Sequence, residues 1–223
     1  MDNSLKIAGQ AIKTNIKPGF LLWVLLVLFG IGYTTIPGFN HGLMKLAELK
    51  LKWGHISSFI AYSFAAALFP EILKILFFQK GKAKKENIKN ILFGIVLFGL
   101  AGIITDIFFS TVQVWLYGNG SDLATVLKKT VTDQFSFSPM ICTVVLVFLM
   151  WKENDFQVNT KQEFSFSMFF KEKLIPLYVA MWLVWIPGVA LVYFMPTALQ
   201  LPVSSFILCF WALIISFMSL KKS

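Results

Sequence analysis

A stripe of small and polar residues follows one apolar segment, 91–117, at the steps of three or four that place residues on one face of a helix. An acid inside a bilayer costs at least about 2.5–3.5 kcal/mol, so Asp106 in this stripe needs a partner, a water-filled cavity or a proton. One interpretation is a polar pathway or binding cavity, in which Asp106 sets the charge preference. The other is helix packing, in which glycines admit a neighbouring helix and polar side chains bond across the contact. The members of the stripe are Gly99, Gly102, Asp106, Ser110, Gln113 and Tyr117.

A charged pair, Glu71 and Lys74, lies three residues apart in the apolar run 56–78. This spacing permits an ion pair on one face of a helix. A structural salt bridge near the cytoplasmic end is one interpretation, and a gate in a solute pathway is the other.

Signatures of catalysis and of metal binding are missing from the sequence. The two histidines, His41 and His55, have no second pair of ligands that would complete a metal site. Gly118-Asn119-Gly120 indicates a turn and not a phosphate-binding loop. We therefore expect neither enzyme activity, nor a cofactor, nor a metal. The lysines lie between apolar runs, so nucleic acid is not an expected partner either.

The composition is that of an integral membrane protein. The chain has 223 residues, 57% hydrophobic and 14% charged, whereas typical soluble domains are about 25% charged. A helix that crosses a bilayer needs roughly 20 apolar residues. We expect an all-α, polytopic membrane protein of about six transmembrane helices in a single integral membrane domain, 1–223. The expected spans are 19–36, 56–78, 91–117, 137–151, 174–194 and 201–220, of which 137–151 is the weakest.

The lysines predict the orientation of the chain. All 20 basic residues are lysines, and if every run crosses, most of them share one side with both termini. The positive-inside rule makes that side cytoplasmic, and anionic lipid headgroups become the expected partner. The segment 37–55 is then a loop on the opposite side. The segment 121–135 is an amphipathic helix near the interface, with a kink at Pro139 that leads into the next run.

The second half of the chain carries two linked motifs. In LKKTVTDQFSFSP, a basic pair, an acid–Gln step and a proline correspond to Lys128, Lys129, Asp133, Gln134 and Pro139. In the closing part, WLVWIPG and the last apolar run supply Trp182, Trp185, Pro187 and Trp211. Together they resemble the 22-kilodalton peroxisomal membrane protein family, most clearly over 121–220. The chain departs from the family pattern after the Trp-Pro step, where the family's Gln and Asn are replaced by apolar residues and its Arg by Gln200.

The resemblance implies a small polytopic protein, often described as channel-like, of the mitochondrial inner membrane or the peroxisomal membrane. In a prokaryote the same chain would lie in the plasma (inner) membrane. With the polar stripe, the expected function is a pathway for small polar solutes or ions, and Asp133–Gln134 would join its helix to neighbouring helices. The alternative is a non-catalytic membrane scaffold, with a homo-oligomer left open. A lipid-acting enzyme with Asp106 or Asp133 as acid or base is less favoured.

Overall fold

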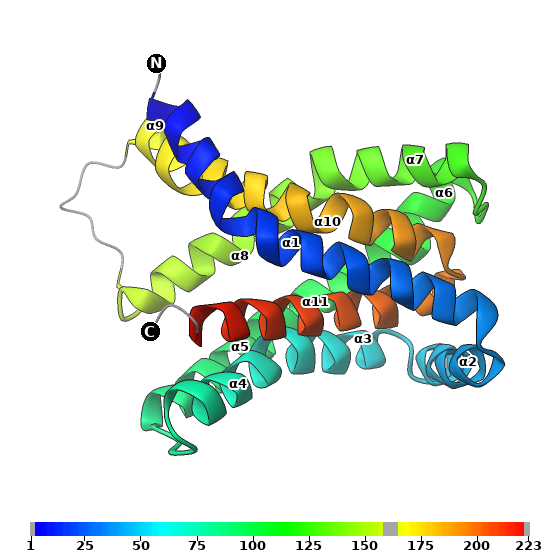
Figure 1. The fold of residues 1–223 in the computed structure, drawn as a ribbon, viewed down its shortest axis with the longest axis horizontal. Helices are drawn as coiled ribbons and strands as arrows, with labels where there is room; N and C mark the ends of the chain where they lie inside the picture. Colours follow the sequence, from blue (N-terminus) through cyan, green and yellow to red (C-terminus); the bar gives the residue numbers. More distant parts are fainter. Residues whose placement is uncertain (1–2, 158–164, 221–223) are drawn as a thin grey trace.

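The computed structural model describes residues 3–157 and 165–220, and this part of the chain is helical, without strands (Figure 1). The all-α prediction is therefore confirmed. The α-helices are α1 (Asn3–Thr35), α2 (Pro37–Trp53), α3 (His55–Tyr62), α4 (Phe69–Phe78), α5 (Lys85–Ile107), α6 (Gln113–Tyr117), α7 (Leu123–Thr132), α8 (Ser138–Glu153), α9 (Phe166–Phe169), α10 (Ile175–Phe194) and α11 (Thr197–Leu220). In the described residues, four π-helical turns join consecutive helices: Ser63–Leu68, Phe108–Val112, Asp133–Phe137 and Phe170–Leu174.

Within the described residues, five helical segments are long and apolar enough to cross a bilayer. They are Asn15–Thr35, His55–Phe78, Lys85–Tyr117, Leu123–Glu153 and Ser167–Phe194, and Thr197–Leu213 is a shorter apolar helix. These segments are those of an integral membrane protein. The expected span 137–151 lies inside the observed segment Leu123–Glu153, which begins earlier because the amphipathic helix continues through the π turn at Asp133–Phe137 into α8.

The segment 37–53, predicted as part of a loop, is the helix α2. Pro37 suits its first turn, where a backbone N–H has no intrahelical partner. Gly54, with a φ of 56°, ends the helix and turns the chain into α3. Leu43 and Ala47, four residues apart, are its buried residues. In Figure 1 α2 is seen nearly end-on while the long helices run across the view, so it lies across one end of the bundle.

Helices distant in the sequence pack side by side in this bundle. Helix α1 lies along α10, and α3 lies along α5 (Figure 1). The α3–α5 contact is close because α5 presents glycines to it: a Cβ added at Gly102 would lie 2.6 Å from the Cβ of Tyr62 and 2.7 Å from the carbonyl oxygen of Ser58. The small residues of the predicted stripe thus face a neighbouring helix.

Candidate functional site

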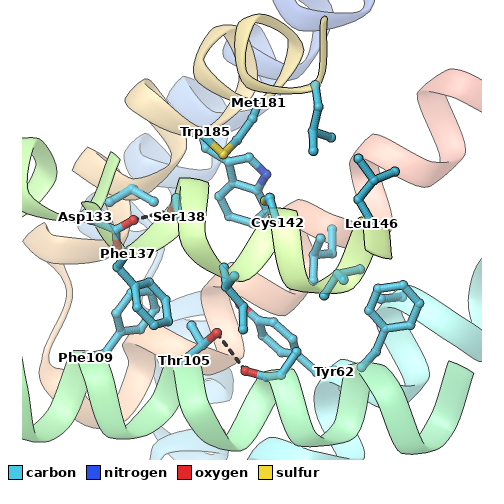
Figure 2. A pocket seen from close by; sticks show the side chains of 18 of the residues that line it. Tyr62, Thr105, Phe109, Asp133, Phe137, Ser138, Cys142, Leu146, Met181 and Trp185 are labelled. Carbon is cyan, nitrogen blue, oxygen red and sulfur yellow. Dashed lines mark hydrogen bonds between the residues drawn. The ribbon is translucent and has the colours of Figure 1, made fainter. Parts of the chain in front are cut away.

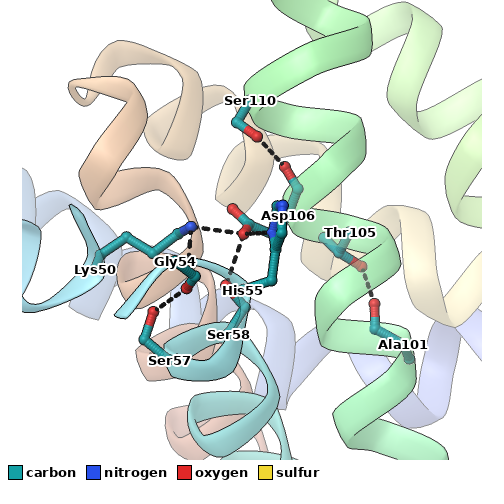
Figure 3. Close-up of polar contacts among 9 residues, drawn as sticks. All are labelled: Lys50, Gly54, His55, Ser57, Ser58, Ala101, Thr105, Asp106 and Ser110. Atoms are coloured by element: carbon teal, nitrogen blue, oxygen red, sulfur yellow. Dashed lines mark hydrogen bonds and ion pairs between the residues drawn. The ribbon is translucent and has the colours of Figure 1, made fainter. Parts of the chain in front are cut away.

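Three side chains converge on one oxygen of the buried Asp106 carboxylate (Figure 3). Lys50 Nζ donates a hydrogen bond to Oδ2 at 2.6 Å, and Ser58 Oγ donates to the same atom at 2.8 Å. His55 Nδ1 also lies 2.6 Å from Oδ2. Lys50 belongs to the last turn of α2, and His55 and Ser58 to the start of α3, so the turn at Gly54 brings all three to α5. The lysine is the charged partner that an acid in an apolar segment requires.

The sequence could have pointed to Lys50. It follows the buried Leu43 and Ala47 at the helical steps of four and three, so it lies on the buried face of α2. Because the segment 37–55 was predicted to be a loop, the helical spacing of Leu43, Ala47 and Lys50 was not considered.

The rest of the stripe is bonded within the protein. Ser110 Oγ donates to the backbone oxygen of Asp106 at 2.7 Å. Gln113 is fully buried, and its Nε2 donates to the backbone oxygen of Lys129 at 3.1 Å. The Tyr117 hydroxyl shares a hydrogen bond of 2.6 Å with Thr132. Among the cavities in the described part of the chain, four measure 230–320 Å³, and none of these four is lined by Asp106, Ser110, Gln113 or Tyr117.

Glu71 forms the centre of a second polar cluster, where α4, α5 and the end of α8 meet. Its ion pair with Lys74 is long, at 3.4 Å. Two side chains that the sequence did not single out bind it more closely: Asn87 Nδ2 donates at 2.6 Å and Asn90 Nδ2 at 2.9 Å. Lys152 of α8 donates in turn to Asn90 Oδ1. The cluster therefore connects three helices, and the Lys74 side chain, which pairs with Glu71 from α4, is 45% exposed.

Asp133, the acid of the second-half motif, is buried and accepts hydrogen bonds from three neutral groups. Ser138 Oγ donates to Oδ1 at 2.5 Å, and Gln134 Nε2 donates to the same oxygen at 3.0 Å. Tyr193 of α10 donates to Oδ2 at 2.7 Å. The Asp133 side chain thus joins the α7–α8 helix to α10.

The backbone of this π turn explains why Trp182 binds next to Gln134 and Pro139. A π turn bonds each N–H to the carbonyl five residues earlier, and the residue five after Gln134 is Pro139, which has no N–H. The indole N–H of Trp182 donates to the carbonyl oxygen of Gln134 at 2.7 Å instead. The ribbon changes direction between α7 and α8 (Figure 1), as expected at a π turn followed by proline.

Of the remaining motif residues, Lys129 lies at the contact between Asp133 and Tyr193, and the others lie elsewhere. Lys129 is buried, with Nζ 5.9 Å from the centre of the Tyr193 ring, whereas Lys128 is exposed. Pro187 lies inside α10, and Trp211 packs against the main core from α11. Trp185 faces a cavity.

This cavity of about 230 Å³ lies between α5, α8 and α10 (Figure 2). Apolar side chains form most of its wall, among them Phe98, Phe109, Phe137, Leu146 and Met181.

Most polar groups on this wall already have partners inside the protein. Thr105 Oγ1 donates to the Ala101 carbonyl oxygen at 2.8 Å, the Tyr62 hydroxyl lies 3.2 Å from Ser204 Oγ, and Ser138 donates to Asp133. The indole N–H of Trp185 has no hydrogen-bond partner among the described residues. Apart from the weak thiol donor of Cys142, which also lines it, the cavity therefore offers an apolar space with one unpaired N–H donor.

No family model matches the chain, and neither the curated proteins nor the solved structures contain a match to it. Among the described residues, no group of three or more His, Cys, Asp and Glu side chains is placed to hold a metal ion. The candidate site is therefore defined by its own geometry.

Proposed function

We propose that this chain is a non-catalytic, multi-pass membrane protein that binds an apolar molecule of the lipid class in the cavity between α5, α8 and α10. The observation that carries the proposal is the nearly complete internal bonding of the polar groups on the cavity wall. An apolar cavity of this kind stays dry and accepts apolar ligands.

The size and chemistry of the cavity define the ligand. An engineered cavity of about 150 Å³ accommodates benzene, so 230 Å³ accommodates a longer hydrocarbon segment. The unpaired indole N–H of Trp185 favours a ligand with one hydrogen-bond acceptor, such as an ester carbonyl. The surrounding bilayer holds such molecules at high concentration.

A pathway for small polar solutes or ions, the function expected from the stripe, is the second candidate. The ion pair of Asp106 with Lys50 and the internal bonding of Gln113 and Tyr117 weaken its support. Asp133 favours it, because this acid borders the cavity and its three hydrogen-bond partners are all neutral. A cation in the cavity would meet this carboxylate.

The topology that we propose has six spans with both termini on the cytoplasmic side, with α11 as the sixth. Its 24 residues give a helix of about 36 Å, which exceeds the roughly 30 Å of a hydrocarbon core. The scaffold role, a homo-oligomer, the contact with anionic headgroups, the host membrane and the family resemblance remain predictions from the sequence.

Binding can be tested with a dibrominated fatty-acid methyl ester, a neutral lipid-type probe whose bromine quenches tryptophan fluorescence. We expect saturable quenching in detergent-solubilised protein, and we expect Trp185→Phe to remove that component. Cys142→Phe places a ring in the cavity and should weaken binding at least tenfold. The matched control is Cys209→Phe, which fills a different cavity and should leave Trp185 quenching unchanged.

Equal binding by the Cys142→Phe and Cys209→Phe variants would refute the assigned location. Conductance in a planar bilayer decides between the two candidates. Discrete openings by folded, inserted protein, with a cation preference that falls in Asp133→Asn, would replace the binding proposal by the pathway.

A further inference from the structure

We infer that Asn119 is a site of spontaneous modification, at which the backbone nitrogen of Gly120 displaces the side-chain amide and the residue becomes aspartate or isoaspartate. The site lies in the connection between α6 and α7 and shares no residue with the cavity between α5, α8 and α10. The inference therefore stands whether or not the proposed function is correct.

The reaction is favoured where an asparagine is followed by a residue without a side chain. The chain contains one Asn-Gly pair, Asn119-Gly120. A Cβ on the second residue would obstruct the approach of its nitrogen to Cγ of the asparagine. Glycine lacks this atom and also adopts backbone conformations that are closed to other residues. Gly118, on the other side of Asn119, has a φ of 73°, so the reacting residue lies between two glycines.

The structure leaves the attacking nitrogen free. In the interior of an α-helix each backbone N–H is bonded to a carbonyl oxygen. Asn119 and Gly120 instead lie outside α6 and α7, and both are exposed. The Gly120 N–H has no hydrogen-bond partner among the described residues. The nitrogen can therefore turn towards the Asn119 side chain without breaking a hydrogen bond.

The carbon that is attacked is polarised by a residue from another helix. Thr197 Oγ1, at the start of α11, donates a hydrogen bond to Asn119 Oδ1 at 3.3 Å. A donor on this oxygen draws electron density away from Cγ and favours attack there. The amide nitrogen, which is the leaving group, has no partner within the described chain.

The reaction needs only water. The Gly120 nitrogen gives its proton to water and forms a bond to Cγ, and Nδ2 takes up a proton and leaves as ammonia. Water then opens the five-membered imide. Breaking the new bond to Cγ gives aspartate, whereas breaking the bond to the main-chain carbonyl gives isoaspartate, whose main chain is longer by one carbon atom. Either product adds a negative charge close to Asp122, the residue that caps α7.

The test follows residue 119 by peptide mass spectrometry while the purified full-length protein is held in detergent at mildly alkaline pH. Methylation by protein isoaspartyl methyltransferase identifies the isoaspartate product. Asn154 is the control within the same sample, because it is also exposed but is followed by Asp155, and its Nδ2 donates to the Gln157 carbonyl oxygen at 2.6 Å. We expect Asn119 to convert at least tenfold faster than Asn154.

Gly120→Ala should slow the conversion at least tenfold. Because its Cβ would lie 3.0 Å from Asp122 Oδ2, Asn119→Gln is a second variant; it keeps the amide but requires a six-membered ring, so conversion at residue 119 should be lost. Equal rates for Asn119 and Asn154, or an unchanged rate in Gly120→Ala, would overturn the inference. Asn119-Gly120-Ser121 also matches the acceptor pattern for N-glycosylation. A glycan on Asn119 in protein from its native membrane would equally overturn it, because the substituted nitrogen no longer leaves as ammonia.

Discussion

Asp106→Asn should destabilise the protein strongly, because it removes the charge that neutralises Lys50. The Lys50–Asp106 distance is 2.6 Å, and the two side chains are 11% and 2% exposed. Removing one partner of a buried ion pair typically costs 3–5 kcal/mol, since the other charge stays buried without compensation. The substituted amide still accepts from Ser58, and Lys50 reaches the edge of a groove, so we expect the low end of this range, about 3 kcal/mol.

The assay is reversible unfolding in mixed micelles, followed by far-ultraviolet circular dichroism and compared with Asp133→Asn. This control has the same chemistry, and both acids are 1% exposed. The hydrogen-bond partners of Asp133 are neutral, so its substitution leaves no cation unpaired and should cost about 1 kcal/mol. Lys50→Met combined with Asp106→Asn should cost less than the sum of the single changes. Equal losses in Asp106→Asn and Asp133→Asn, or additive losses in the double variant, would refute the assignment of Asp106 to a structural ion pair.

Three further predictions concern backbone contacts and a helix cap. Gly102→Ala should lower the unfolding free energy by about 1–3 kcal/mol, because the added Cβ would collide with α3. The control is Gly42→Ala, where an added Cβ has no neighbouring atom within 4 Å; it should be neutral or stabilising in the same unfolding titration. Trp182→Phe should cost about 1–2 kcal/mol in that assay by leaving the Gln134 carbonyl without its donor; a cost equal to that of Trp115→Phe, whose ring is exposed, would contradict this. Hydrogen bonds from Thr125 hold the pKa of Asp122 below its usual value, so this cap stabilises α7 above that value and the contribution is lost as the pH falls through the lowered pKa. Asp122→Ala should therefore reduce the melting temperature at about pH 6 and not at a pH well below about 3.9; a loss that is the same at both would be inconsistent.

The apolar runs were enough to predict the helical class and most of the membrane-length segments. The run 91–117 lies within the observed segment Lys85–Tyr117, and 174–194 within Ser167–Phe194. Long runs are predictable because each follows from local composition. The run 137–151 was harder, since its helix begins in the amphipathic segment before it.

The partners of the polar residues could not be predicted in the same way. Asp106 lies 56 residues from Lys50 and 51 from His55, and no local pattern encodes such pairings. The stripe predicts a solute pathway only when its helix is considered without the neighbouring helices. The glycines and polar groups of that helix instead face α2, α3 and α7.

The two buried acids of the described residues lie beside π turns, and these turns also contribute to the cavity wall. Asp106 precedes the turn Phe108–Val112, and Asp133 begins the turn Asp133–Phe137. Phe108 and Phe137, one from each turn, stack with ring centres 3.9 Å apart, and Phe137 also lines the cavity. Single π turns are rare and are frequent at functional sites. Because both turns contribute lining residues to this cavity while the Asp106 carboxylate is paired with Lys50, the proposed ligand site is the cavity, and the stripe joins helices.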